Sequence, residues 1–248
     1  MRTETVLRKL RALGFDEQDA AVLADHFIEA ERRGQRGHGL ARIDWLADER
    51  FEARGSGRLV VEEEGYQRWD GEGAMGYLML AAICRAQIES PPKSARVVVA
   101  SDCFPSGMLG YWTRQLAEAG LVAALTATSP PRLAHPDGGP RLAGTNPLSI
   151  AVPSSEGPPV VSDVSMGEVT YGDVIAGRAS EDDLVPFGGQ KAYKAFALAL
   201  GLQLFVDALA GEDHGAVLVV AQPYADPIPG LRRAAPDVRL PGDGPTKA

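Results

Sequence analysis

The chain has 248 residues, of which 45% are hydrophobic and 23% are charged, so it is long enough to fold as one large domain or two small ones. Its 25 Lys and Arg residues against 33 Asp and Glu residues give a net charge of −8, which argues against general binding to nucleic acid or to an anionic membrane. Cys84 and Cys103 form no disulfide framework and lack the spacing of a zinc site, so no metal site is expected.

The N-terminal sequence and the apolar stretches indicate where in the cell the protein is located. Residues 1–5 lead directly into a charged helical pattern, without the apolar stretch of a secretion signal. The longest mostly apolar stretch covers residues 192–210, but Lys194, Gln203 and Asp207 interrupt it. That pattern is typical of a buried helix and not of a membrane span. We therefore expect a cytoplasmic protein.

The first fifty residues predict a small helical subdomain. Apolar side chains recur at three- and four-residue intervals over residues 3–13, which indicates a helix that ends before Gly14. Asp16 can cap a second helix that extends to about Arg33. A glycine-rich break then precedes a third helix, which we expect over residues 40–51.

Alternating strands and helices follow and predict an α/β layer. The β-branched run at residues 96–100 is typical of a strand buried on both faces. A helix over residues 108–119 and a strand over residues 121–126 complete a β–α–β unit. The other expected elements are strands at 59–61, 66–69, 148–152, 160–161 and 216–221, helices at 76–88 and 194–209, a loop at 129–144 and an irregular tail after Gln222.

His38 and Arg42 are the first candidates for chemistry. Gly37 and Gly39 flank the histidine and have no side chains that could cover it, which suits a histidine that faces a ligand. Arg42 lies four residues on, so the two side chains share one face if a helix has begun. An arginine one turn from a histidine can hold a carboxylate while a proton is moved beside it. The alternative interpretation is a loop histidine near a surface arginine.

Four further segments carry weaker signals. Thr145 lies in a Gly-Thr-Asn-Pro turn, Asp163 follows the strand at residues 160–161, and Asp173 follows a Tyr-Gly pair. Each alone is typical of a turn or of a capping carboxylate. The turn at residues 188–191, Gly-Gly-Gln-Lys, opens a helix, and a glycine pair there can let a phosphate approach backbone N–H groups.

Six segments occur in one order along the chain: GHGLAR at 37–42, GTNP at 144–147, VSD at 161–163, GD at 172–173, PFGGQK at 186–191 and RLPG at 239–242. Together they resemble the malate/L-lactate dehydrogenase family, which also contains L-sulfolactate and ureidoglycolate dehydrogenases and the Δ1-piperideine-2-carboxylate reductases. The resemblance covers nearly the whole chain, and the combination is specific although each piece alone is not.

The resemblance implies a non-Rossmann α/β fold like that of L-sulfolactate dehydrogenase. It implies a helical subdomain at residues 1–65 that carries the catalytic histidine, an α/β cofactor-binding domain at 66–221 and an irregular tail at 222–248 that packs back on the site. It also implies NADH or NADPH as the cofactor, a small carboxylate substrate, and a homodimer with the active site near the subunit interface.

The resemblance further implies roles for individual residues. His38 would donate a proton to the substrate with Asp173 as its partner, and Arg42 and Thr145 would hold the substrate carboxylate. The residues implied to lie along the cofactor are Cys103, Phe104, Pro105, Ser106, Gly107, Asp163, Val164, Ser165, Gly188, Gly189 and Lys191.

Asp173 also selects among possible reactions. In the resembling family this position often holds Lys in the 2-hydroxy-acid dehydrogenases and Asp in the imino-acid reductases. A carboxylate beside His38 favours the charged imidazolium, so we expect reduction of a C=N bond next to a carboxylate, with 2-oxo-acid reduction as the alternative. A third hypothesis is a homologue that binds a nucleotide without catalysis. It is favoured by the shorter chain and by Gly37, where the family usually has serine.

Overall fold

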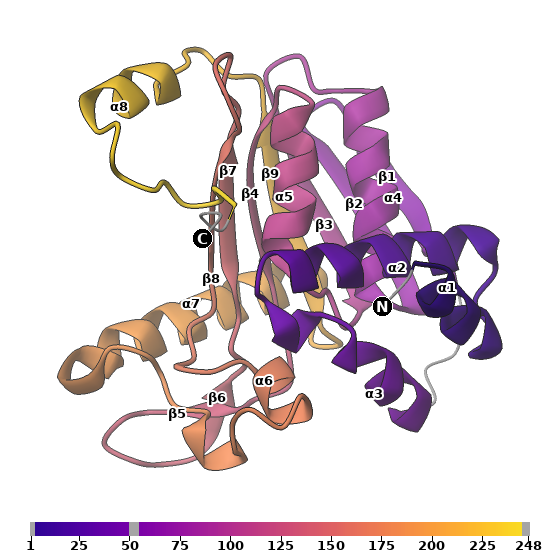
Figure 1. Cartoon of the computed structure of the whole chain (residues 1–248). Coiled ribbons are helices and arrows are strands. Elements are labelled where there is room, and N and C mark those ends of the chain that lie inside the picture. The colour runs from indigo at the N-terminus through magenta and orange to yellow at the C-terminus, as the bar shows by residue number, and fades with distance from the viewer. Residues whose placement is uncertain (1–2, 50–54, 245–248) are drawn as a thin grey trace.

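Figure 1 shows the computed structural model of the protein, which describes residues 3–49 and 55–244. Its centre is a seven-stranded sheet in which only β2 and β3 are parallel, while every other neighbouring pair is antiparallel. This mixed sheet differs from the parallel sheet of a doubly wound fold, and the expected non-Rossmann α/β fold is confirmed. In sheet order the strands are β1 (Arg58–Glu63), β2 (Tyr66–Ala74), β3 (Ala95–Cys103), β9 (Gly215–Ala221), β4 (Val122–Ala127), β7 (Leu148–Val152) and β8 (Val160–Val164).

Helices cover both faces of this sheet. On one face, α4 (Gly76–Glu89) and α5 (Leu109–Glu118) pack against the strands and carry α1 (Thr3–Ala12) and α2 (Glu17–Arg32) on their outer side. On the other face lies α7 (Ala192–Ala210). In β3, the side chains of Val98 and Ala100 belong to the hydrophobic core under α4 and α5, and the side chain of Val99 belongs to the core under α7. The expectation of a strand buried on both faces is therefore confirmed.

The N-terminal helices agree with the sequence pattern. The side chain of Asp16 accepts a hydrogen bond from the backbone N–H of Asp19 at 2.8 Å, which caps α2 as expected. The glycine-rich break contains a single 3-10 turn, η1 (Arg36–His38), and α3 (Ala41–Glu49) follows it. The expected end of this helix at residue 51 lies outside the described residues.

Two segments before the C-terminal tail differ from the sequence expectation. The loop expected at residues 129–144 contains a small hairpin of β5 (Leu133–Ala134) and β6 (Arg141–Ala143). A short helix, α6 (Tyr171–Ile175), was not expected. The strand expected at residues 59–61 is confirmed, because residues 58–63 pair with β2 as the edge strand β1.

The described part of the C-terminal tail, residues 222–244, makes hydrogen bonds with the rest of the chain. It contains a helix that the sequence did not predict, α8 (Ile228–Ala234), and then runs back across β8 (Figure 1). The backbone N–H of Val161 donates to the carbonyl of Pro241 at 3.0 Å, and Nη2 of Arg114 donates to the carbonyl of Gly242 at 2.8 Å. The described part of the tail therefore packs back on β8 and α5.

α7 has two contrasting sides. Its inner side packs on the sheet and on the β5–β6 hairpin through small and branched residues such as Ala199 and Val206. Its outer side exposes the apolar side chains Tyr193, Leu198, Leu204, Phe205 and Leu209. Among the described residues, 189–210 form one helix long and apolar enough to cross a membrane, a criterion that core helices also meet.

Candidate functional site

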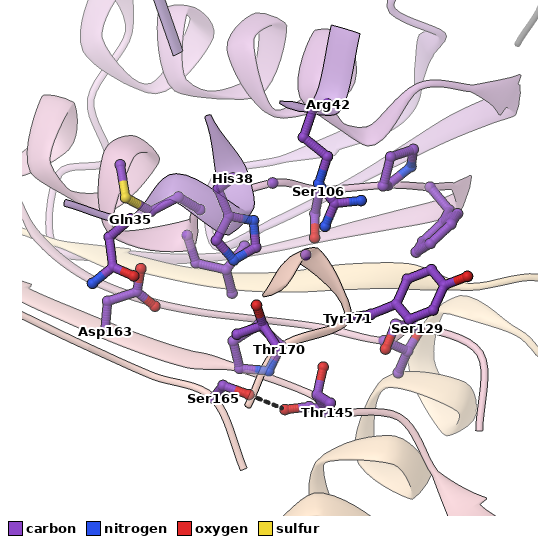
Figure 2. Close-up of a pocket in the computed structure, with 18 of the residues that line it drawn as sticks. Gln35, His38, Arg42, Ser106, Ser129, Thr145, Asp163, Ser165, Thr170 and Tyr171 are labelled. Atoms are coloured by element: carbon purple, nitrogen blue, oxygen red, sulfur yellow. Dashed lines mark hydrogen bonds between the residues drawn. The ribbon is translucent and has the colours of Figure 1, made fainter. Parts of the chain in front are cut away.

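A cavity of about 140 Å³ lies where the N-terminal helices meet the sheet, and we call it the central cavity. Its walls come from η1 and α3, from the loop after β3, from the segment after β4 and from the start of α6. Figure 2 shows Gln35 and Asp163 together at one end, Arg42 and Tyr171 at the other, and His38 between them. Of the expected site residues, those lining it are His38, Arg42, Phe104, Pro105, Ser106, Gly107, Thr145, Asp163 and Ser165.

His38 ends the turn η1, and the tight packing of its neighbour Gly37 fixes this turn. A Cβ atom on Gly37 would lie 2.9 Å from the carbonyl carbon of Gly172 and 3.0 Å from the backbone nitrogen of Asp173. Such a contact is too close for a real side chain, so only glycine lets η1 approach α6 in this way. The serine that usually precedes the histidine in the resembling family has no space here.

The imidazole of His38 is uncharged. Burial and the nearby positive charge of Arg42 lower its pKa from 6.5 to about 3, and the negative charge of Asp173 offsets this only in part. Nδ1 of His38 is enclosed by protein and has no hydrogen-bond partner among the described residues. The remaining ring nitrogen, Nε2, is therefore the one left to meet a ligand.

Arg42 is a buried cation, with 6% of its surface exposed. Its Nε donates to the carbonyl of Gly37 at 2.9 Å, and its guanidinium carbon lies 4.9 Å from the centre of the Trp45 ring. Burial is the main cause that lowers its pKa. These contacts fix the direction of the guanidinium, and Figure 2 shows it entering the central cavity opposite Thr145.

Asp173 does not form the expected pair with His38. Its Oδ2 accepts hydrogen bonds from the backbone N–H of Thr170 at 3.0 Å and from the Thr170 hydroxyl at 2.7 Å, which makes a capping box at the start of α6. Its Oδ1 accepts from Nη2 of Arg178 at 2.6 Å. Both carboxylate oxygens are thus engaged elsewhere, and Asp173 acts on His38 only through its charge.

Asp163 is the carboxylate within the cavity. Its Oδ2 accepts a hydrogen bond from the backbone N–H of Gly110 at 2.7 Å. Partial loss of hydration at the cavity wall raises the pKa of Asp163 to about 6 against the effect of the Gly110 hydrogen bond, although the residue as a whole stays exposed. Two other expected residues do not line the central cavity. Cys103 ends β3 with its side chain buried in the hydrophobic core, and Val164 lines a neighbouring pocket.

The Gly-Gly-Gln-Lys turn lies away from the central cavity. Gly188 precedes the 3-10 turn η3 (Gly189–Lys191) at the start of α7. Gly189 lines a separate cavity of about 630 Å³ near the β5–β6 hairpin, and neither Gly188 nor Lys191 lines the central cavity. Contact of this turn with the cofactor stays a prediction.

Several residues of the cavity wall were not predicted from the sequence. The guanidinium carbon of Arg132 lies 3.3 Å from the centre of the Tyr171 ring, and both side chains line the cavity. Gln35, Ser129 and Thr170 complete the polar part of the wall. A local signal existed for Thr170, because a threonine three residues before an aspartate is the pattern of a capping box.

Comparison with known proteins places the chain in a family. Residues 2–184 match the family model described as malate/L-lactate dehydrogenase. The chain belongs to this family. It is 26% identical over 236 residues to a malate dehydrogenase of Pyrococcus abyssi, covering 83% of this chain and 65% of the relative's length. It is 29% identical over 230 residues to a Δ1-pyrroline-2-carboxylate/Δ1-piperideine-2-carboxylate reductase of Pseudomonas putida, covering 80% of this chain and 66% of that relative.

A solved structure of Δ1-piperideine-2-carboxylate reductase from Pseudomonas syringae has the same fold. The TM-score is 0.83, with 22% sequence identity and coverage of 97% of this chain and 89% of the other. At this identity the likeness shows the fold alone. The present chain therefore keeps the fold of the family. It spans slightly less than two thirds of the length of the Pyrococcus abyssi and Pseudomonas putida relatives, 65% and 66% respectively.

Proposed function

We propose that this protein is an NAD(P)-dependent oxidoreductase that moves a hydride to or from a carbon atom bonded to a carboxylate. The observation that carries the proposal is the joint placement of a buried Arg42 and an uncharged His38 on the wall of one cavity. A guanidinium binds a carboxylate through two parallel hydrogen bonds. An imidazole is the side chain best suited to exchange a proton near neutral pH.

Each side chain has a separate task in this proposal. The bond from Nε of Arg42 to the carbonyl of Gly37 leaves the two Nη atoms to bind the substrate carboxylate. The hydroxyl of Thr145 adds a hydrogen-bond donor from the opposite wall. Nε2 of His38 accepts the hydroxyl proton when a 2-hydroxy acid is oxidised, because Nδ1 is enclosed by protein. In the reduction direction the protonated imidazole returns this proton to the substrate oxygen, and a substrate carboxylate bound to Arg42 would favour that protonated form.

The residues around the cavity suit a nicotinamide dinucleotide. Phe104 to Gly107 form one wall, Asp163 and Ser165 lie opposite, and the cavity adjoins a pocket with three arginines. In that pocket Nε of Arg114 is buried without a hydrogen-bond partner among the described residues, a donor that an anionic ligand would satisfy. When bound, the cofactor supplies the hydride. Either NADH or NADPH is consistent with these residues.

We favour a 2-oxo acid and its 2-hydroxy acid as the substrate pair. An uncharged His38 beside the cation Arg42 gives no attraction for a positively charged iminium, and Asp173 is held by Thr170 and Arg178. Arg132 supports a substrate with a second acidic group, since its guanidinium is stacked on the cavity wall. Malate, named for the Pyrococcus relative, is a substrate of this kind.

Reduction of a cyclic imine is the second candidate. The negative charge of Asp173 acts to raise the pKa of His38, and a ligand carboxylate bound to Arg42 would remove part of the opposing positive charge. The Pseudomonas putida relative is named for this reaction. A substrate that brings its own carboxylate would in this way favour protonation of His38 during the reaction.

We also propose that the protein acts as a homodimer. The exposed apolar side of α7, with Leu198, Leu204 and Phe205, supports an apolar interface with a second copy. Light scattering on wild type and on Leu204→Glu tests this, and a monomeric wild type contradicts it. A cytoplasmic location stays a prediction from the sequence.

Loss of the absorbance of reduced nicotinamide tests the function directly. NADH and NADPH are each supplied with oxaloacetate, pyruvate or Δ1-piperideine-2-carboxylate. We expect the highest kcat/KM with oxaloacetate, and a near-complete loss in Arg42→Ala with every substrate. A higher kcat/KM with the imine selects the second candidate. Binding of the nucleotide by calorimetry without turnover on any substrate supports the non-catalytic hypothesis.

A further inference from the structure

A continuous segment after β3 forms one wall of the central cavity. Every residue from Phe104 to Met108 lines this cavity, and we call the segment the wall loop. The proposed function places the dinucleotide against this wall. The position of the wall loop therefore decides where the reactive ring lies relative to His38, which lines the same cavity. Side chains that hold the loop from behind can control the reaction through it.

Two hydrogen bonds attach the wall loop to the helices on the sheet. The backbone N–H of Tyr77, at the start of α4, donates to the carbonyl of Pro105 at 3.0 Å. Nε1 of Trp112, on α5, donates to the carbonyl of Ser106 at 2.8 Å. Because α4 and α5 pack directly on the sheet, these bonds fix the loop relative to the sheet.

His26 attaches the same loop to α2. The backbone N–H of Met108 donates to Nε2 of His26 at 3.0 Å, and both residues are buried. An imidazole that accepts at Nε2 carries its proton on Nδ1 and is uncharged. Burial lowers the pKa of His26 well below its usual range, and the nearby His38 and Arg42 lower it further. The ring therefore remains an acceptor at neutral pH.

The rings around His26 restrict its orientation. Its ring centre lies 4.8 Å from those of Tyr77 and Tyr111 and 5.4 Å from that of Trp112. Gly107 of the wall loop packs directly on this cluster. A Cβ atom at Gly107 would lie 2.7 Å from Nε2 of His26 and would also overlap the ring of Tyr77. The loop and the ring cluster thus fit together without space for a side chain between them.

The place of His26 in the chain gives the bond to Met108 a further consequence. His26 lies on α2, and α2 leads directly into η1, which ends at His38. One segment of the chain therefore carries both the imidazole that exchanges the substrate proton and the acceptor that holds the wall loop. The bond between His26 and Met108 links the position of the wall to that of His38.

We propose that His26 is a positioning residue for the reaction, which holds the wall loop at its distance from His38 through the N–H of Met108. The inference rests on the proposed function, which places the reactive ring against this loop. His26 itself does not line the central cavity, so it acts on the loop and not on the substrate. Hydride transfer depends on the alignment of the reacting atoms, and a displacement near 1 Å can lower the rate about 100-fold.

Two variants of similar size separate this role from a purely structural one. His26→Gln places an amide oxygen near the position of Nε2 and can accept the Met108 N–H, whereas His26→Leu has no acceptor. Steady-state rates are measured with the nucleotide and the substrate that wild type uses best. We expect kcat to fall about 10- to 100-fold in His26→Leu and to be largely retained in His26→Gln.

Hydrogen exchange followed by mass spectrometry measures the loop itself. Exchange reports local opening, so it should be faster over residues 104–108 in His26→Leu than in wild type and in His26→Gln. Leu10→Ala is the matched control, because Leu10 is fully buried on α1 and does not line the cavity. It should lower the Tm, as large-to-small core substitutions do, and leave kcat and loop exchange unchanged.

The outcomes separate this inference from the proposed function. An active wild type with equal kcat in His26→Leu and His26→Gln, or with a matching fall in Leu10→Ala, shows that His26 has only a structural role. If wild type turns over no substrate, the proposed function is wrong, and equal loop exchange in the variants then overturns this inference as well. Should His26→Leu fail to fold, His26→Phe replaces it, since it keeps a ring in the cluster and likewise lacks an acceptor.

Discussion

The close packing of Gly37 against α6 gives a prediction that a single substitution can test. In the structure, Gly37→Ser would put a Cβ atom 2.9 Å from the carbonyl carbon of Gly172 and 3.0 Å from both the backbone nitrogen and Oδ1 of Asp173. Two of these three atoms are backbone, so they cannot move aside as a flexible side chain would. Either η1 or α6 must shift.

The size of the effect follows from the cost of overpacking, which is about 1–3 kcal/mol. A change of 1 kcal/mol moves the Tm of a protein of this length by about 2–4 °C. Gly37→Ser is therefore expected to lower the Tm by about 2–12 °C. Since α6 supplies Tyr171 to the cavity wall, the shift should also lower kcat/KM, by up to about 100-fold for a displacement near 1 Å.

Two further variants make this test specific. Gly37→Ala adds the same Cβ without a hydroxyl group, so it should be destabilised as much as Gly37→Ser. Gly230→Ser is the control, because a Cβ at that position meets no atom within 4 Å. Differential scanning fluorimetry measures the Tm, and steady-state rates measure activity. A Gly37→Ser protein with unchanged Tm and higher activity than wild type would refute the packing argument and show that η1 has room for the serine that the family usually carries there.

Three other predictions concern the central cavity. His38→Ala should lower kcat about 10²- to 10⁴-fold and leave nucleotide affinity measured by calorimetry nearly unchanged, because the proposal gives His38 only the proton transfer. Arg42→Lys keeps the charge and loses the paired geometry, so kcat/KM should fall by the equivalent of about 1–3 kcal/mol; an unchanged value removes Arg42 from substrate binding. The pKa of His38 is 6.5 in the unfolded chain and about 3 in the folded protein, so the unfolded chain binds more protons between these pH values. The free energy of unfolding therefore falls as the pH drops from 7, by at most about 1.4 kcal/mol per pH unit for this one group. Urea unfolding of His38→Gln at pH 7 and pH 5 should therefore show a smaller decrease than wild type.

Local patterns predicted the parts of the fold that depend on neighbouring residues. The run around Val99 indicated a strand buried on both faces, and the polar residue Asp16 indicated the start of α2. The helix α8 was missed because its stretch contains several prolines, although Pro229 stands in the first turn, where proline is tolerated. The small hairpin of β5 and β6 was missed because each strand has only two or three residues.

The residues of the site also separate into those that local spacing predicted and those that only the fold brings together. The spacing of His38 and Arg42 and the family motifs placed both residues correctly in one cavity. No local pattern could place Arg132 on the ring of Tyr171, 39 positions away, because only the fold brings them together. The turn at residues 188–191 carried a motif of the family but lies beside a different cavity. Sequence order therefore identified the family more reliably than it located each residue.

Asp173 shows why proximity and pairing have different chemical consequences. A carboxylate hydrogen-bonded to His38 would stabilise the imidazolium directly, whereas here its two oxygens bond Thr170 and Arg178. The same bonds cap α6, whose residue Gly172 lies close to Gly37. The pKa of His38 is lowered mainly by burial and by Arg42, and the charge of Asp173 offsets this only in part. Replacing Arg178 with Gln would free Oδ1 of Asp173 and remove a positive charge that lowers the pKa of His38. In that variant the pKa of His38 should rise, and reduction of an imine should gain relative to reduction of a 2-oxo acid. A ratio of the two rates equal to that of wild type would show that the charge around His38 does not select the substrate.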